Sequence, residues 1–262
     1  MKRSPKNKGV GEHNEISSYT PEKRFPIVGI GASAGGLEAL QQFFQNTPAN
    51  TGMAYVVIQH LDPNRVGMMP ELLQRTTMMK VIQVTNRLLA RPDIVYVIPP
   101  NKYMSISNGY LKLSEQKDIR GLRLPIDTFF ISLAEDLHEK SIGIILSGMG
   151  SDGSMGLKAI KDNNGLTMVQ DPKESKFEGM PNSAISAVQV DIIASADELP
   201  FKLVSRFRNN APDRINIIQD DSNKTGLEKI INLLLGYTGH DFSQYKKNGL
   251  YRRIERRMMS ME

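Results

Sequence analysis

Short apolar runs alternate with amphipathic stretches between residues 25 and 208 of this sequence. The run from Phe25 to Ile30 is followed by a glycine-rich turn, and then by four apolar residues at helical spacing: Leu37, Leu40, Phe43 and Phe44. An apolar run with β-branched residues, followed by a 3.6-residue period, predicts a strand, a turn and a helix.

This unit recurs along the chain. Continuous apolar runs predict strands buried on both faces at 55–58 and 142–146. Further strands are predicted at 81–84, 94–98, 166–170 and 191–194. Helices are predicted at 69–76, 126–139, 155–162, 181–187 and 198–208. One hairpin interrupts the pattern at 103–113, with Asn108-Gly109 as its turn. Strands that alternate with helices indicate an α/β fold, a doubly wound and mostly parallel sheet with helices on both faces.

The two ends of the chain differ from this region. Residues 1–24 are polar and lack an apolar period, so we expect a disordered leader. Residues 209–224 are rich in Asn, Asp and Pro and predict a linker. Residues 225–262 predict a short C-terminal helical segment, whose first helix has one apolar face made of Leu227, Ile230, Ile231, Leu234 and Leu235. The α/β domain is therefore expected to span residues 25–208.

The composition narrows the chemistry. None of the 262 residues is cysteine, so disulfides, thiolate metal sites and cysteine nucleophiles are excluded. The net charge of +5 is unevenly spread, with basic residues dense before residue 25 and between Lys246 and Arg257. We interpret the N-terminal group as solvated, and the C-terminal group either as solvated or as a contact for an acidic partner surface. No stretch approaches the roughly 20 apolar residues of a membrane span, and the polar N-terminus has no signal-peptide core. We therefore expect a cytoplasmic protein that binds no nucleic acid and inserts into no membrane.

The first glycine-rich loop is a candidate nucleophile site. Gly31-Ala32-Ser33-Ala34-Gly35 matches the G-x-S-x-G pattern of a nucleophile elbow between a predicted strand and a predicted helix. The glycines permit the sharp turn that presents a serine hydroxyl, and the helix N-terminus offers backbone N–H groups to an oxyanion. The same loop fits the G-x-G-x-x-A dinucleotide fingerprint, although the second strand ends in Gln59-His60 where that fingerprint requires an acid. A glycine turn that only packs a helix on a strand is the third interpretation.

His60 is the candidate general base. Of the four histidines, it alone follows an interior strand, at the carboxyl edge where α/β sheets bind ligands. A lone histidine there is more often structural or exposed, but the neighbouring nucleophile elbow favours a base. No second histidine lies near it in the sequence, so no metal site is expected.

Asp152 lies in a third loop, Ser147–Ser154, which contains three glycines and again joins a predicted strand to a predicted helix. It is interpreted as a helix N-cap, as the acid that orients His60, or as both. Together Ser33, His60 and Asp152 form a candidate serine-esterase triad, in which the serine attacks a carbonyl, the histidine takes its proton and the aspartate fixes the imidazole.

At these loops the sequence resembles the catalytic domain of the chemotaxis receptor methylesterase family, CheB. The resemblance covers about residues 25–208, and its matching stretches are Ile30–Gly36, Gln59-His60, Leu124–Asp127, Ile144–Gly153 and Gly179–Pro181. It implies Ser33, His60 and Asp152 as the triad, with Met149 and the Ala34 backbone beside the reacting carbonyl.

The resemblance also implies an activity. Such enzymes hydrolyse glutamyl γ-methyl esters on chemoreceptors and release methanol, and some members deamidate receptor glutamines. Methylated chemoreceptor cytoplasmic domains are the expected partners, and no cofactor is implied. Two alternatives are a catalytically silent receptor-binding adaptor within a larger signalling hybrid and a phosphate-binding module that uses the glycine-rich loops.

The C-terminal segment carries a second resemblance. The stretches Leu233–Gly236, Thr238–Phe242 and Leu250–Met258 resemble the start of the N-terminal helical domain of the receptor methyltransferase family, CheR. The S-adenosylmethionine-binding domain of that family would follow later, so no transferase activity is expected from these residues. The sequence thus resembles the front of a CheB/CheR hybrid.

Overall fold

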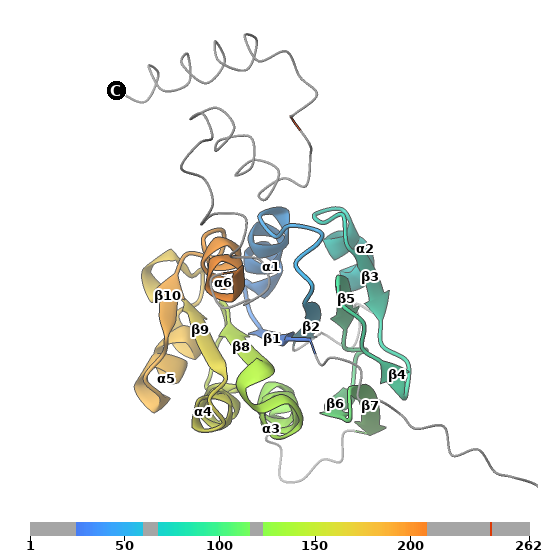
Figure 1. Ribbon diagram of the computed structural model, residues 1–262. Coiled ribbons are helices and arrows are strands. Elements are labelled where there is room, and N and C mark those ends of the chain that lie inside the picture. The colour runs from blue at the N-terminus through green and yellow to red at the C-terminus, as the bar shows by residue number, and fades with distance from the viewer. Residues whose placement is uncertain (1–24, 60–67, 116–122, 209–241, 243–262) are drawn as a thin grey trace, which may run out of the picture.

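The computed structural model of the chain describes residues 25–59, 68–115, 123–208 and 242. Within these residues, seven strands form one sheet in the order β10-β9-β8-β1-β2-β5-β3, and every neighbouring pair is parallel. The strands are β1 Ile27–Ala32, β2 Ala54–Gln59, β3 Lys80–Gln83, β5 Ile94–Val97, β8 Ser141–Ile145, β9 Leu166–Gln170 and β10 Ile192–Ala194. The predicted doubly wound α/β fold is confirmed (Figure 1).

Helices cover both faces of this sheet (Figure 1). Helices α1, α2 and α6 pack on one face, and α3, α4 and α5 pack on the other. The helices are α1 Gly36–Gln45, α2 Met68–Gln74, α3 Pro125–Leu137, α4 Ser154–Asp162, α5 Gly179–Ala187 and α6 Leu199–Arg208, with short 3-10 helices η1 His138–Lys140 and η2 Pro172–Glu174. Because both faces are covered, strands β1, β8 and β9 are buried along their whole length, which explains their continuous apolar runs.

The first strand alternates between large and small side chains. Val28 and Ile30 belong to the core on the α1 side, whereas Gly29 and Gly31 face α3. A Cβ atom at Gly31 would lie 2.5 Å from Cγ2 of Ile126, so glycine lets the first turn of α3 approach the strand closely. The N-terminus of α3 therefore lies near the carboxyl end of β1, which Ser33 follows.

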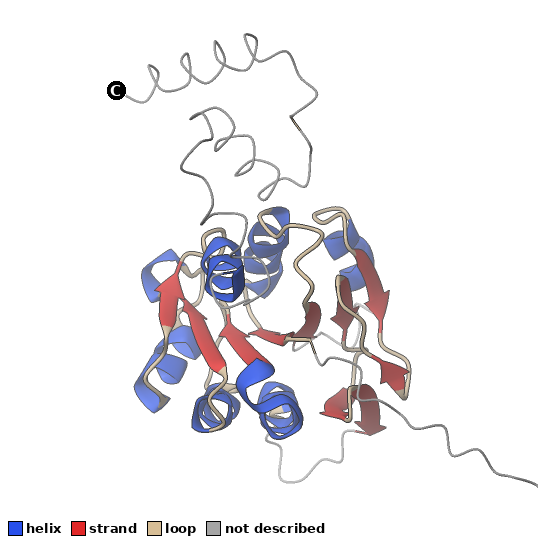
Figure 2. Ribbon diagram, in the orientation of Figure 1, coloured by secondary structure: helices blue, strands red, loops and turns tan. Residues whose placement is uncertain are grey.

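A small antiparallel sheet lies beside the main one (Figure 2). The predicted hairpin is confirmed as β6 Lys102–Ser107 and β7 Tyr110–Glu115, with φ of 52° at Asn108 and 76° at Gly109, as a type I′ turn requires. The Asp136 carboxylate of α3 accepts hydrogen bonds from the N–H groups of these two turn residues, at 2.7 and 2.9 Å. A third strand, β4 Leu88–Leu89, pairs with β7 and was not predicted, because two residues carry no periodicity.

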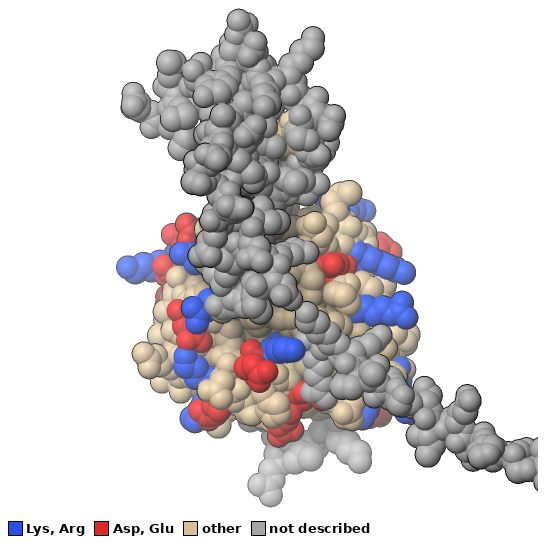
Figure 3. Space-filling view, viewed as in Figure 1, with Lys and Arg blue, Asp and Glu red and all other residues tan. Residues whose placement is uncertain are grey.

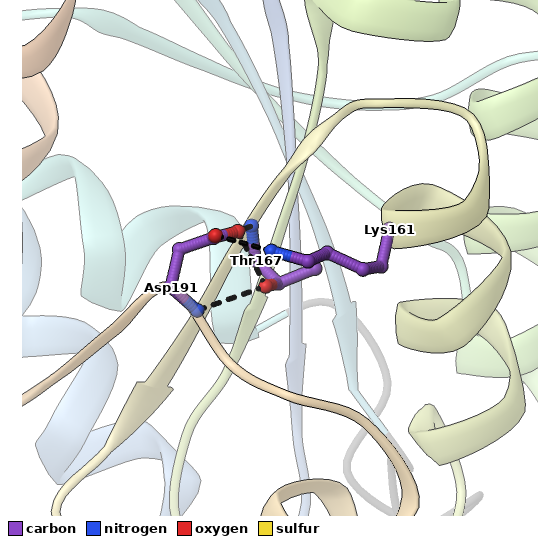
Figure 4. Close-up of polar contacts among 3 residues, drawn as sticks. All are labelled: Lys161, Thr167 and Asp191. Carbon is purple, nitrogen blue, oxygen red and sulfur yellow. Dashed lines mark hydrogen bonds and ion pairs between the residues drawn. The ribbon is translucent and has the colours of Figure 1, made fainter.

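The edge strand β10 is fastened through Asp191 (Figure 4). The Asp191 carboxylate accepts hydrogen bonds from the Thr167 backbone N–H at 3.0 Å and from the Thr167 hydroxyl at 2.7 Å, and it pairs with Lys161. Burial alone would raise the pKa of Asp191, but the hydrogen bonds from Lys161 and Thr167 outweigh burial and hold that pKa below its ordinary value. An ionised Asp191 therefore ties the start of β10 to β9 and α4.

Acidic and basic side chains are interspersed on the face seen in Figure 3, so the described surface there has no field of one sign. None of the described helices is both long and apolar enough to cross a bilayer. The predicted leader 1–24, the linker 209–224 and, apart from residue 242, the segment 225–262 lie outside the described residues.

Candidate active site

The candidate site lies at the carboxyl edge of the sheet, where the loops after β1 and β8 meet. Strand β1 lies between β2 and β8 and pairs with both in parallel register. From β1 the chain winds toward β2 in one direction, and from β8 it winds toward β9 in the other, so the β1/β8 boundary is a topological switch point. The two loops are joined directly, because the Ser33 N–H donates to the Ser147 carbonyl at 3.0 Å.

Ser33 occupies a tight strand-to-helix turn. The turn closes through Gly35, whose φ of 68° is in the left-handed region, and through a 2.9 Å hydrogen bond from the Gly36 N–H to the Ser33 carbonyl. Ser33 is half-buried. The N–H groups of Ala34 and Gly35 have no hydrogen-bond acceptor among the described residues. Two unused N–H groups beside a serine, at the start of α1, suit a developing oxyanion.

The opposite wall of the turn is the glycine-rich loop after β8. A Cβ atom at Gly148 would lie 3.0 Å from the Ser33 Cβ and 2.1 Å from the Met180 Sδ, so a larger residue would require the Met180 side chain or the Ser33 turn to shift. The Gly148 N–H donates to the Phe177 carbonyl at 3.0 Å, and the Met180 N–H donates to the Gly148 carbonyl at 2.9 Å. The start of α5 and the Ser33 turn thus pack against the same loop, at Gly148.

Asp152 is buried, with 6% of its surface exposed, and it caps a helix other than the one that follows it. Its Oδ2 accepts a hydrogen bond from the Ile126 N–H at 3.0 Å, and its Oδ1 accepts one from the Asp127 N–H at 2.9 Å. These are N–H groups of the first turn of α3, which has no cap from its own preceding residue. The interpretation of Asp152 as the N-cap of the helix that follows it is wrong, because the N-cap position of α4 is Gly153. Asp152 instead caps α3.

Asp127 connects α3 back to α4. The sequence analysis gave this residue no role of its own. Its Oδ1 accepts a 2.7 Å hydrogen bond from the Gly156 N–H in the first turn of α4. Burial raises the pKa of Asp127, the neighbouring Asp152 carboxylate raises it further, and backbone N–H donors counter part of the rise. An acid in the first turn of a helix is common, so only the Leu124–Asp127 stretch of the resemblance pointed to this residue.

This geometry agrees with comparisons to known proteins. A family model described as CheB methylesterase matches residues 28–203. The chain belongs to the CheB methylesterase family. A second model, the all-alpha domain of CheR methyltransferase, matches residues 225–261. The order of the two matches supports the predicted CheB/CheR hybrid.

Individual relatives support the CheB assignment. A protein of Leptospira interrogans, provisionally named a protein-glutamate methylesterase/protein-glutamine glutaminase, is 32% identical over 191 residues, which cover 72% of this chain and 99% of the relative. A protein-glutamate methylesterase/protein-glutamine glutaminase of Clostridium acetobutylicum is 31% identical, over 75% of this chain and 56% of that protein. The crystal structure of the Thermotoga maritima CheB methylesterase catalytic domain superposes with a TM-score of 0.65 at 29% identity, covering 70% of this chain and 99% of that one. The chain is thus a carboxylic ester hydrolase by family.

Within the CheB fold, the loops that carry Ser33 and Asp152 converge, but the third member of the predicted triad is not described. His60 lies outside the described residues. The residue before it, Gln59, ends β2 and reaches the neighbouring turn, with 3.5 Å between its Nε2 and the Ser33 carbonyl oxygen. The role of His60 stays a prediction.

The two further residues predicted near the reacting carbonyl, Ala34 and Met149, are both described. The Ala34 carbonyl accepts a 3.0 Å hydrogen bond from the Ser147 hydroxyl. Met149 is 64% exposed and belongs to the loop that walls the serine. No cluster of three potential metal ligands occurs within the described parts of the chain.

Proposed function

We propose that this chain hydrolyses glutamyl γ-methyl esters on the cytoplasmic domains of chemoreceptors, with Ser33 as the nucleophile, His60 as its base and Asp152 as the residue that orients the base. The observation that carries the proposal is the junction of the Ser33 and Asp152 loops at the carboxyl edge of adjacent strands. His60 follows β2, the strand on the other side of β1, by one residue. All three residues thus follow three neighbouring strands at one edge.

The reaction then has two halves. Ser33 Oγ attacks the ester carbonyl while His60 accepts its proton, and the negative charge of the tetrahedral intermediate is held by the N–H groups of Ala34 and Gly35. The intermediate collapses, the C–O bond to the methyl group's oxygen breaks, and His60 returns the proton to methanol. A water molecule, deprotonated by His60, hydrolyses the acyl-enzyme and releases the glutamate side chain and the free serine.

A second activity of the same site is deamidation of receptor glutamines. The relatives from Leptospira interrogans and Clostridium acetobutylicum are named glutaminases as well as methylesterases. The same acyl-enzyme forms from a glutamine side chain, with ammonia as the leaving group instead of methanol.

We propose that residues 25–208 form the esterase domain and that residues 225–262 form the start of a CheR-type helical domain, in a protein that acts in the cytoplasm.

The test is methanol release from a methyl-labelled receptor cytoplasmic fragment by the full chain. We expect release by the wild type and a loss of roughly 10⁴-fold or more in Ser33→Ala and in His60→Ala. Ser205→Ala is the control, because the Ser205 hydroxyl donates to the Lys202 carbonyl within α6, and this is the only hydrogen bond of that hydroxyl among the described residues. Receptor binding without release by the wild type would favour the adaptor. Undiminished release by Ser33→Ala would show that another residue is the nucleophile.

A further inference from the structure

Ser147 is a buried serine that forms hydrogen bonds with the Ser33-Ala34 turn. It follows β8 by two residues and is 1% exposed. Its backbone carbonyl accepts the Ser33 N–H at 3.0 Å, and its hydroxyl donates to the Ala34 carbonyl at 3.0 Å. One residue therefore bonds both ends of the Ser33-Ala34 pair.

These two bonds enclose the reactive part of the turn. Between the Ser33 N–H and the Ala34 carbonyl lie the Cα that carries the Ser33 hydroxyl and the Ala34 N–H proposed to hold the oxyanion. Once both ends are fixed, the Ser33 Cα and the Ala34 N–H are held in place relative to β8, and rotation about the Ser33 side-chain bond is the remaining way to move the hydroxyl. Misplacement of reacting groups by about 1 Å costs on the order of 100-fold in rate.

Ser147 is itself held by partners that leave it little freedom. Its N–H donates to the Gln170 Oε1 at 2.8 Å, and Gln170 is 2% exposed at the end of β9. Its hydroxyl oxygen accepts the Phe177 N–H at 3.0 Å, and the Ala34 carbonyl at 3.0 Å is a nearer acceptor for the hydroxyl hydrogen than the Phe177 carbonyl at 3.5 Å. The donor, the acceptor and both backbone groups of Ser147 are thus all used.

We infer that Ser147 is a positioning residue for the esterase reaction: its hydroxyl and its carbonyl set the placement of the Ser33 hydroxyl and the Ala34 N–H relative to Asp152, which lies on the same loop. The inference rests on the proposed function of Ser33. Ser147 touches neither substrate nor the reacting atoms, and it acts through the backbone of the turn.

The test compares Ser147→Ala with Ser141→Ala in the full chain. Ser141 begins the same strand at the opposite edge of the sheet, is 0% exposed, and donates its hydroxyl to the His138 carbonyl. Each variant removes one buried serine hydroxyl, so both are expected to lower the melting temperature by roughly 2–8 °C. Only Ser147→Ala is expected to lower kcat for methyl-ester hydrolysis, by about 10- to 100-fold, with KM changed less than about two-fold.

A second readout does not depend on the natural substrate. The rate at which a fluorophosphonate labels Ser33 reports the nucleophile and the oxyanion donors together, and we expect the same drop of about 10- to 100-fold in Ser147→Ala. If Ser147→Ala proves unstable, Gln170→Met replaces it. This variant removes the acceptor of the Ser147 N–H, and a fall of about 3- to 10-fold in labelling is expected.

The outcomes separate the inference from the proposed function. Wild-type rates of labelling and hydrolysis in Ser147→Ala, with a lowered melting temperature, would overturn the positioning role and leave the esterase intact. Equal losses of kcat in Ser147→Ala and Ser141→Ala would also overturn it, since the effect would then be one of general stability. A wild-type chain that neither releases methanol nor labels at Ser33 would overturn both.

Discussion

Asp127 and Asp152 cap each other's helices. Asp152, in the loop before α4, accepts the Ile126 and Asp127 N–H groups at the start of α3, and Asp127 accepts the Gly156 N–H at the start of α4. Both carboxylates are buried. The crossing of the two helices and the orientation of the proposed triad acid are therefore set by the same two carboxylates and three backbone N–H groups.

Replacement of Asp127 by alanine removes the acceptor of the Gly156 N–H. The free energy of unfolding should fall by about 1–3 kcal/mol, because a buried donor is left without a partner. Methyl-ester hydrolysis should also slow, because the start of α3, which holds the Asp152 carboxylate, is then less firmly attached to the start of α4. Urea unfolding and the methanol assay measure the two effects. Asp127→Asn keeps an acceptor oxygen and should avoid the loss that alanine causes, and a loss as large as that of alanine would contradict the capping role.

The stability of Asp127→Asn relative to wild type should depend on pH. Because burial raises the pKa of Asp127, the folded protein binds its proton more tightly than the unfolded chain does. Stability from this group is present below the ordinary pKa of 3.8 and is lost as the pH rises through the folded pKa. Asp127→Asn stays neutral, so its stability relative to wild type should be higher at neutral pH than near the ordinary pKa. Urea midpoints at the two pH values test this, and a constant difference would refute it.

Asp152→Asn separates capping from catalysis. An asparagine presents one oxygen and one NH₂ to two backbone N–H donors, so we expect a loss of stability of about 1–3 kcal/mol and a loss of kcat of roughly 10³- to 10⁴-fold. Asp136→Asn is the matched control, because Asp136 also accepts two backbone N–H groups, in the hairpin turn. Asp136→Asn should lose stability but keep the wild-type kcat. Full activity in Asp152→Asn would remove Asp152 from the proposed triad.

Gly148→Ala should act through Met180. The added methyl group would meet the Met180 Sδ at 2.1 Å and the Ser33 Cβ at 3.0 Å, so either the methionine or the serine turn must shift. We expect a fall in both stability and kcat. Met180→Ala makes room for the methyl group, so the double variant should be more stable than the sum of the two single losses, by about 1 kcal/mol in a double-mutant cycle. Additive losses would show that the clash is relieved elsewhere.

Asp191→Asn should weaken the edge strand in a pH-dependent way. The pKa of Asp191 is depressed in the fold, so its contribution is present above the ordinary pKa of 3.8 and is lost as the pH falls through the folded pKa. The variant should be about 1–2 kcal/mol less stable than wild type at pH 7, and the gap should narrow in acid. Asp162→Asn breaks the exposed Lys158–Asp162 pair and should cost under about 0.5 kcal/mol at either pH. Equal losses in the two variants would contradict the role of Asp191.

Much of the fold could be predicted because its signals are local. The continuous apolar runs marked strands buried on both faces, and Asn108-Gly109 marked the hairpin through its positive φ angles. The order of strands has no local signal, and nothing in the sequence of β1 alone says that β8 is its neighbour. The same limit hid β4, which has two residues and owes its existence to pairing with β7.

The candidate site divides in the same way. Ser33 could be predicted because a nucleophile elbow is a contiguous motif. Asp152 was singled out by its glycine-rich loop, but its hydrogen bonds run to α3, far away in the sequence. The contacts of Ser147 and Asp127 also join distant segments, and a buried serine or a first-turn acid looks ordinary until the partner is known. The role of His60 remains a prediction from position.

The pairing of β1 with β8 has a consequence for synthesis. Strands β1 and β2 leave the ribosome soon after one another, but the other edge of β1 stays open until Ile145 has emerged. An open apolar strand edge is a template for pairing with other chains, so such pairing competes with the native β1–β8 pairing during this interval. Asp152 follows Ile145 in the sequence, so the proposed triad of Ser33, His60 and Asp152 cannot assemble until the second half of the sheet has been translated.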